Sequence, residues 1–308
     1  MDRYQQHFHA LGSEVVLTIV TDQHQKDAQV LLEEMRAQIN AFEDRFSRFR
    51  ETSELSTFNN RAGNKVAISE SFRKLLLSAQ TLSKQTEGIY NPFILPALQR
   101  AGYQGSWPKP DSFQKSTDYS DGEIVPINKL HIEKDWAKIP PHTALDFGGI
   151  GKGYLLDQLA HYISDKEVSG YWFSLGGDII CGGHDLRNKD WHIAVGGAEK
   201  ATEIIATVSN DNGEQLAIAT SGVTKRKGTK SGKDWHHIID PRTGTSSATD
   251  ILTVTVTAHT AVVADVYAKC IVVTGRDHSE AYRIDGIIQS YIIQGKDGSV
   301  LLRDNTGR

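Results

Sequence analysis

Hydrophobic residues recur at helical spacing in two stretches of the first third of the chain. Between residues 26 and 50 they fall three or four positions apart, which predicts a long amphipathic helix with one buried face. That face comprises Val30, Leu31, Met35, Ile39, Phe42, Phe46 and Phe49. Residues 70–86 predict a second helix, which the Glu87-Gly88 pair ends.

Short apolar segments predict strands, and most of them lie in the second half of the chain. The strand candidates are 14–20, 143–147, 171–175, 179–181, 191–195, 204–208, 215–219, 236–239, 252–258, 290–294 and 299–302. Helices are predicted at 151–163, 260–273 and 277–285. Mixed strands and helices at hairpin-length spacings favour an α+β layered fold over a regular doubly wound sheet.

The pattern is weaker from residue 101 to residue 142. This stretch holds five of the eight prolines, beside short strand candidates at 129–132 and 137–139. It is not polar enough for a linker. We therefore expect an irregular insertion at about 101–142, within one domain that spans residues 1–308.

Composition narrows the class of protein. With 308 residues, 23% of them charged and a net charge of −4, the chain can bury a full core and resembles an ordinary globular protein. The charge gives no reason to expect nucleic acid or a membrane surface, and no apolar run approaches the roughly 18 residues of a spanning helix. Cys181 and Cys270 stand in apolar contexts, so we expect both to be reduced and buried. Without a signal-peptide layout at the start, the sequence predicts a cytoplasmic protein, unless an export signal has been trimmed.

One glycine-rich junction points to phosphate binding. Residues 145–154 read Leu-Asp-Phe-Gly-Gly-Ile-Gly-Lys-Gly-Tyr, so an apolar run ends in Asp146 and Lys152 opens the next helix. Such a junction directs backbone N–H groups, a helix N-terminus and one ammonium toward a single point. It is not a P-loop, because Asp146 and Gly153 stand where that motif needs a glycine and a hydroxyl. Tyr154 replaces the third small residue of a dinucleotide fingerprint. A tight turn that only packs a helix against a sheet remains the alternative.

A second group of basic residues lies at 225–233, where five lysines and arginines share a glycine-containing loop. We favour a solvated hairpin tip there over a contact with a polyanion.

Seven motifs occur in the order in which one known family carries them. They are Leu11-Gly-Ser, the F-S-R-F and S-E-L-S-T-F-N segments of 46–59, the G-I-Y-N-P-F-I-L-P of 88–96, the D-F-G-G-I-G-K-G-Y of 146–154, the L-G-G-D-I of 175–179, the A-T-S-G of 219–222 and the H-I-I-D-P-R-T-G of 237–244. With them the chain resembles the flavin transferase family named ApbE, the FAD:protein FMN transferases. The resemblance implies a layered mixed α/β domain of the T-fold-like ApbE type.

The resemblance also implies an activity and a set of site residues. Members of the family bind FAD and move its FMN half onto a threonine of a partner protein, releasing AMP with the help of a divalent metal. By resemblance, FAD contacts fall on Leu11, Phe49, Ile89, Tyr90, Asn91, Asp146, Lys152, Ser221 and His237. The same resemblance assigns oxygen ligands for Mg²⁺ to Gly149, Asp265, Ala268 and position 269. His237 is also a candidate base for the attacking hydroxyl, since a histidine titrates near neutrality. Ordinary inward and outward alternation of His236 and His237 on a strand is the alternative.

The sequence departs from the family pattern at the metal. Lys269 replaces the threonine of D-x-x-x-T, and a charged ammonium has no lone pair for a metal. Lys269 could replace the metal as the counter-charge of the phosphate, or it could swing outward and leave a weakened site. A solvent-facing lysine is less expected, because Lys269 lies one helical turn from Asp265. Asn91 replaces an aspartate of the pattern, Phe49 replaces a tyrosine, and the residues after Gly222 also differ.

Three functions are compatible with these residues. The sequence favours an FMN transferase with His237, Asp265 and Lys269 as catalytic residues and a flavoprotein acceptor inside the cell. The alternatives are an FAD-binding protein that has lost transfer, and a hydrolase that converts FAD to FMN and AMP.

Overall fold

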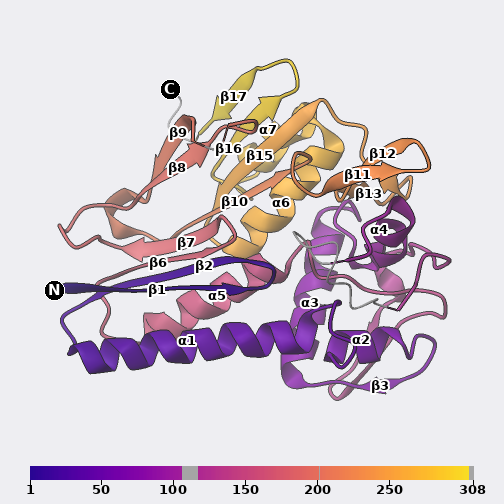
Figure 1. Cartoon of the computed structure of the whole chain (residues 1–308), viewed down its shortest axis with the longest axis horizontal. Helices are drawn as coiled ribbons and strands as arrows, with labels where there is room; N and C mark the ends of the chain where they lie inside the picture. The colour runs from indigo at the N-terminus through magenta and orange to yellow at the C-terminus, as the bar shows by residue number, and fades with distance from the viewer. Residues whose placement is uncertain (106–116, 201, 305–308) are drawn as a thin grey trace.

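An eight-stranded sheet forms the spine of the computed structural model, which describes residues 1–105, 117–200 and 202–304 (Figure 1). All of its strand pairs are antiparallel. In sheet order, the strands are β1 (Asp2–Ala10), β2 (Ser13–Thr21), β6 (Gly170–Leu175), β7 (Asp178–Gly183), β10 (Leu216–Gly222), β15 (Ile251–Ala258), β16 (Ser290–Gly295) and β17 (Val300–Arg303). Helices and an antiparallel sheet in separate layers confirm the predicted α+β class.

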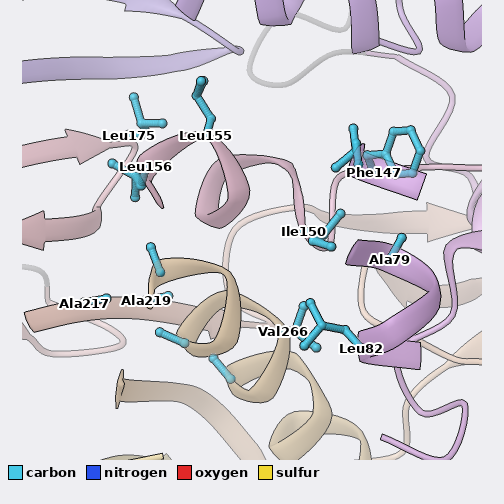
Figure 2. Close-up of a cluster of buried hydrophobic side chains, with 14 of the residues drawn as sticks. Ala79, Leu82, Phe147, Ile150, Leu155, Leu156, Leu175, Ala217, Ala219 and Val266 are labelled. Carbon is cyan, nitrogen blue, oxygen red and sulfur yellow. The ribbon is translucent and has the colours of Figure 1, made fainter. Parts of the chain in front are cut away.

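Helices α1 (Gln25–Phe46), α5 (Gly151–Ser164) and α6 (Ala261–Thr274) pack against this sheet. Helix α1 runs along β1 and β2, α5 contacts β6 and β7, and α6 contacts β10 and β15. Strand β10 shows the period of two that this packing needs. Its Ala217 and Ala219 face α6 (Figure 2), whereas Leu216 and Ile218 face the opposite side.

Helices α5 and α6 cross very closely. A Cβ atom at Gly153 would lie 2.4 Å from the carbonyl oxygen of Ala261, so the crossing requires a glycine. Asp157 of α5 accepts hydrogen bonds from the backbone N–H groups of Ala261 at 2.6 Å and Val262 at 2.9 Å. The carboxylate of one helix thus satisfies the free N–H groups at the start of the other.

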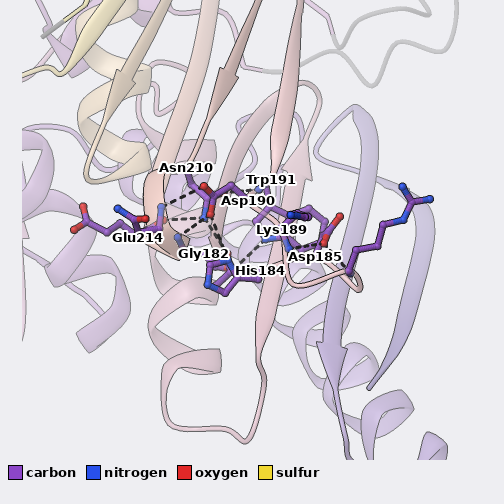
Figure 3. A network of polar contacts seen from close by, with 12 residues as sticks. Gly182, His184, Asp185, Lys189, Asp190, Trp191, Asn210 and Glu214 are labelled. Carbon is purple, nitrogen blue, oxygen red and sulfur yellow. Dashed lines mark hydrogen bonds and ion pairs between the residues drawn. The ribbon is translucent and has the colours of Figure 1, made fainter. Parts of the chain in front are cut away.

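The opposite face of β7 and β10 is covered by the hairpin of β8 (His192–Gly196) and β9 (Ile204–Ser209). Buried Asn210 fastens this hairpin to the sheet (Figure 3). Its side-chain amide donates to the carbonyl groups of Gly183 at 2.9 Å and Glu214 at 3.1 Å, and its oxygen accepts from the backbone of Trp191 at 2.6 Å. The single-turn helix η3 (Asp211–Gly213) follows, and α7 (Arg276–Ile284) follows α6.

A group of short elements lies at one end of the sheet, on the right in Figure 1. Its helices are α2 (Glu54–Asn59), α3 (Glu70–Gln85), η1 (Pro92–Ile94), α4 (Leu95–Ala101) and η2 (Ile127–Lys129). Its strands are β3 (Val66–Ala67), β4 (His131–Ile132), β5 (Trp136–Lys138), β11 (Lys227–Lys230), β12 (Lys233–His236), β13 (Ile239–Asp240) and β14 (Thr245–Ser246). The predicted insertion at about 101–142 falls here, and its residues 106–116 lie outside the described part of the chain.

Most predicted elements are present, and several details of the prediction are wrong. Residues 143–147 form no strand, because the side chain of Asn59 pairs with both backbone groups of Leu145, at 2.8 and 2.9 Å, in place of a neighbouring strand. Helix α1 ends at Phe46, and Val30, expected on its buried face, is 48% exposed. The expected strand at 236–239 is interrupted at His237. Strand β1 was not predicted.

Both cysteines are free and buried, as expected. Within the described residues, every helix is too short or too polar to cross a membrane.

Candidate functional site

A cavity of about 400 Å³ opens where six distant segments of the chain meet. Its walls come from the β1–β2 turn, the end of α1, the region 89–103, the glycine turn before α5, the residues around β12 and β13, and one face of α6. Ten of the residues predicted for the site line it: Leu11, Phe49, Ile89, Tyr90, Asn91, Asp146, Gly149, Lys152, His237 and Lys269. The other three, Ser221, Asp265 and Ala268, are buried in β10 and α6 and do not line the cavity.

Two lysine–aspartate ion pairs form the floor. Lys152, in the first turn of α5, pairs with Asp178 at the start of β7, and Lys269 of α6 pairs with Asp265 one turn earlier. Both lysines line the cavity, whereas both aspartates are buried behind them. Asp178 also accepts the backbone N–H of Thr220 at 3.2 Å. Burial by itself lowers the pKa of Lys152, but Asp178 and Asp265 raise it overall, so this lysine is a stable cation.

Each oxygen of the Asp265 carboxylate already has a partner. One oxygen accepts from the Lys269 ammonium and the other accepts the backbone N–H of Gly153 at 3.2 Å. Lys269 also donates to the backbone oxygen of Asp265 at 3.2 Å. Nowhere in the described residues do three or more His, Cys, Asp or Glu side chains gather as metal ligands would. The donor set around Asp265 therefore does not fit a divalent ion while Lys269 stays in place.

Sequence reasoning missed a stacked arginine in one wall. The guanidinium of Arg48 lies 4.3 Å from the ring centre of Phe49 and 4.7 Å from that of Tyr103. Its Nε lies 2.9 Å from Asp146, which also accepts the backbone N–H of Gly148 at 2.8 Å. Nη1 of Arg48 is buried and has no hydrogen-bond partner among the described residues. Arg48 stands inside a family-like motif, but nothing local in the sequence shows that Tyr103 and Asp146 meet it.

His237 lies between β12 and β13, facing the cavity. Burial, then Arg226 and then Lys269, lower the pKa of His237 to about 3, so its ring is neutral at pH 7. Its Nδ1 is buried and finds no hydrogen-bond partner in the described structure. The neighbouring His236 also has a buried Nδ1 without a partner among the described residues, but its Nε2 lies 3.1 Å from the carbonyl oxygen of Ser247 and it does not line the cavity. Of the two histidines, His237 is the one available to a ligand.

The remaining wall residues divide into apolar contacts and structural groups. The Tyr90 hydroxyl is buried without a hydrogen-bond partner among the described residues, and burial, reinforced by Asp146 and Asp265, raises its pKa. Asn91 uses both ends of its side chain within the protein. It accepts from the backbone of Phe93 at 3.0 Å and donates to the carbonyl of Val125 at 3.0 Å. Asn91 therefore starts η1 and holds the loop that crosses it.

The basic loop at 225–233 contributes one residue to the cavity. Strands β11 and β12 form the predicted hairpin, and its Lys227 and Lys233 are exposed. Lys230 donates to the carbonyl oxygen of Arg100 at 2.9 Å. Arg226, just before β11, lines the cavity and acts electrostatically on His237. The expected solvated tip is present, and sequence reasoning missed the inward arginine at its base.

Fold and site together define a class of protein: an α+β protein whose cavity joins a cationic floor to an aromatic wall, as a phosphorylated ligand with a planar ring requires. Comparison with known proteins makes this specific. The sequence model of the ApbE family matches residues 11–286, and the chain belongs to this family.

Its relatives and structural neighbours agree with that membership. The FAD:protein FMN transferase of Haemophilus influenzae is 26% identical over 286 residues, covering 89% of this chain and 81% of that protein. The protein of the same name from Vibrio cholerae is 28% identical over 260 residues, covering 83% and 76%. The ApbE protein of Thermotoga maritima shares the fold with a TM-score of 0.85 at 21% identity, over 99% of this chain and 98% of that one. The flavin transferase ApbE of Vibrio cholerae gives a TM-score of 0.78 at 23% identity, over 99% and 97%.

Proposed function

We propose that this chain is an FAD:protein FMN transferase, which moves the FMN half of FAD onto a threonine of a partner flavoprotein and releases AMP. One observation carries the proposal: Lys152, Lys269 and Arg226 meet a neutral His237 in a single cavity. These three cationic side chains can donate hydrogen bonds to a diphosphate. The negative charge of that group would offset the cations that lower the pKa of His237, so that its imidazole can accept a proton. The names of the curated relatives support the same activity.

The residues divide between binding and chemistry. We place the isoalloxazine ring of FAD against the aromatic wall of Phe49, Tyr90 and Tyr103, and its diphosphate over the cationic floor. The threonine hydroxyl oxygen then attacks the phosphorus of the FMN half. The new O–P bond forms as the bond to the bridging oxygen breaks, and AMP departs with that electron pair. His237 takes the proton of the hydroxyl, and the floor stabilises the charge that builds on the phosphates.

Mg²⁺ enters no step of this proposal. The Asp265 carboxylate already has a partner at each oxygen, and one of these partners is an ammonium. The expectation of a metal site at Gly149, Asp265, Ala268 and position 269 therefore does not fit the residues present. Residence in the cytoplasm and organisation as a single domain stay predictions from the sequence.

The proposal is tested with FAD and a peptide that carries a target threonine. We expect covalent FMN on the peptide, seen as in-gel fluorescence, with one AMP released for each label. Release of AMP without labelling of the peptide would show that the protein is a hydrolase and not a transferase. Binding of FAD with neither AMP release nor labelling would show that it is a flavin carrier. Material with no affinity for FAD would overturn all three.

Lys152→Gln provides the variant and Lys227→Gln the matched control. Lys152 lies on the cavity floor, whereas Lys227 is exposed on the nearby hairpin. Only the first substitution should weaken FAD binding. Equal losses in the two variants would mean that the cavity floor does not hold the phosphates.

A further inference from the structure

Lys269 is a cavity cation at a position where the family pattern D-x-x-x-T has a threonine. It lies four residues after Asp265 on α6, and its side chain is 20% exposed. Its Cδ lies 3.6 Å from the position that a Cβ at Gly149 would take, so the aliphatic stem runs beside the glycine turn. The ammonium is therefore presented to the cavity by a buried carboxylate and is not a surface lysine.

We propose that Lys269 is a built-in cation that takes the place of a divalent metal at the phosphates of FAD, so that transfer proceeds without a bound metal. This inference rests on the proposed function. A metal at Asp265 would have to displace an ammonium from a carboxylate that is 2% exposed, and the displaced charge would remain in the same cavity. Repulsion between the nearby ammonium and a divalent cation opposes binding of the metal.

The ammonium supplies what phosphoryl transfer needs. Like a metal ion, it neutralises the charge of the phosphates. Unlike a metal ion, it also donates hydrogen bonds to the phosphate oxygens. Asp265, whose carboxylate is held by the backbone N–H of Gly153, fixes the position of the ammonium before the ligand arrives, which is the preorganisation that stabilises a transition state. In the step itself the threonine oxygen bonds to phosphorus, the bridging oxygen leaves with AMP and its electron pair, and His237 receives the proton. Lys269 keeps its protons throughout.

The first experiment measures metal binding directly, with Mn²⁺ as the probe and electron paramagnetic resonance as the readout. We expect no stoichiometric Mn²⁺ site in the unchanged protein, with or without FAD. The variant Lys269→Thr should gain a site, because it removes the ammonium and adds an oxygen. Stoichiometric Mn²⁺ binding by the unchanged protein would overturn the inference, whether or not transfer is observed.

The second experiment measures ligand affinity by quenching of flavin fluorescence. Lys269→Met should weaken FAD binding at least tenfold and leave riboflavin, which lacks phosphate, within about twofold. Lys269→Arg should retain FAD affinity, because it keeps the cation, and exposed Lys227→Met serves as the control. Equal effects of Lys269→Met on FAD and riboflavin would show that this lysine does not face the phosphates.

The third experiment compares transfer in EDTA and in Mg²⁺. We expect the unchanged protein and Lys269→Arg to transfer FMN at the same rate in both, and Lys269→Thr to lose at least tenfold in EDTA. A loss in EDTA by the unchanged protein would overturn the inference while leaving the proposed function intact. If no variant transfers FMN, the proposed function fails, and the Mn²⁺ and affinity measurements still decide the role of Lys269.

Discussion

Arg48 and Asp146 form a buried ion pair in the wall of the cavity, with 2.9 Å between Nε of Arg48 and Oδ2 of Asp146. Their side chains are 5% and 9% exposed. Asp146 was expected to contact FAD, and the structure shows that the protein already supplies it with a partner. Among the described residues the buried Nη1 of Arg48 has no partner, so it is the donor that remains for a ligand.

Breaking this pair on one side should be costly. We expect Arg48→Met to lower the free energy of unfolding by about 3–5 kcal/mol, because it leaves a buried carboxylate without its cation. The double variant with Asp146→Asn should lose less than the sum of the single variants, as measured by urea unfolding in a double-mutant cycle. Additive losses would mean that the two side chains act independently.

The depressed pKa of His237 makes stability depend on pH. The unfolded chain protonates this histidine near its ordinary pKa of 6.5, whereas the folded protein does so only near pH 3. The unfolded state therefore binds more protons between these values, and His237 makes the free energy of unfolding fall as the pH drops through this window. His237→Gln should remove this part of the decline, as measured by urea unfolding at several pH values.

Comparison with the unchanged protein isolates His237 from its neighbours. His236 also has a lowered pKa because it is buried, and it contributes in the same direction. Asp157, whose pKa burial raises to about 6, contributes with the opposite sign. Both groups remain in His237→Gln, so an unchanged pH dependence in that variant would refute the assignment.

Loss of the base should also slow transfer. We expect His237→Gln to reduce turnover by about 10²–10⁴-fold, the range for a general base, and to leave FAD affinity nearly unchanged. His236→Gln is the matched control, because its ring lies against a carbonyl group and not a ligand. Equal losses in single-turnover rates of the two variants would remove His237 from the chemistry.

Two glycines of α5 give a paired test of the helix crossing. Gly153→Ala would place a methyl carbon 2.4 Å from the Ala261 carbonyl oxygen, and we expect it to cost about 1–3 kcal/mol. Gly151→Ala would meet the ring of Phe42 at 3.5 Å and Cβ of Phe147 at 3.9 Å, both ordinary contacts, and should stay within about 1 kcal/mol of the unchanged protein. Thermal unfolding of the two variants checks the difference. Similar melting temperatures would mean that the crossing relaxes easily.

Variants of Arg226, which lines the cavity, and of its exposed neighbour Lys227 distinguish the effect of a cavity charge from that of a surface charge on the hairpin. Arg226→Gln removes a cavity cation and should weaken FAD binding several-fold, with a shallower dependence of affinity on salt. It should also raise the pKa of His237, because Arg226 is one of the charges that lower it. Lys227→Gln should change neither quantity. NMR titration of His237 and flavin fluorescence provide the two readouts.

The sequence predicts elements well where the pattern is local and strong. The apolar stripe from Leu31 to Phe46 and the glycine turn before Lys152 are both present in the structure. Strand β1 was missed because glutamines and histidines separate its partly buried Tyr4 and Phe8, and only pairing with β2 makes it a strand. The apolar residues 143–147 resemble a strand, but the partner of Leu145 is a side chain.

The site, too, was predictable only where its residues lie close together in the sequence. Lys269 and Asp265 lie one turn apart, so the sequence predicted that they share a face of the helix, and the structure adds the ion pair between them. Arg48, Tyr103 and Arg226 come from three distant segments, and no spacing brings them together. Their roles depend on how the short elements at the end of the sheet fold against it.

The six segments that form the cavity also set when it can first exist. Its wall extends from Leu11 to Val273, so every segment between these residues must leave the ribosome before the last contributing side chain is available. A nascent chain lacking α6 has neither Lys269 nor the partner helix of α5. The flavin nucleotide can therefore enter a complete cavity only after α6 has been made, and a polypeptide that terminates before α6 cannot sequester it there.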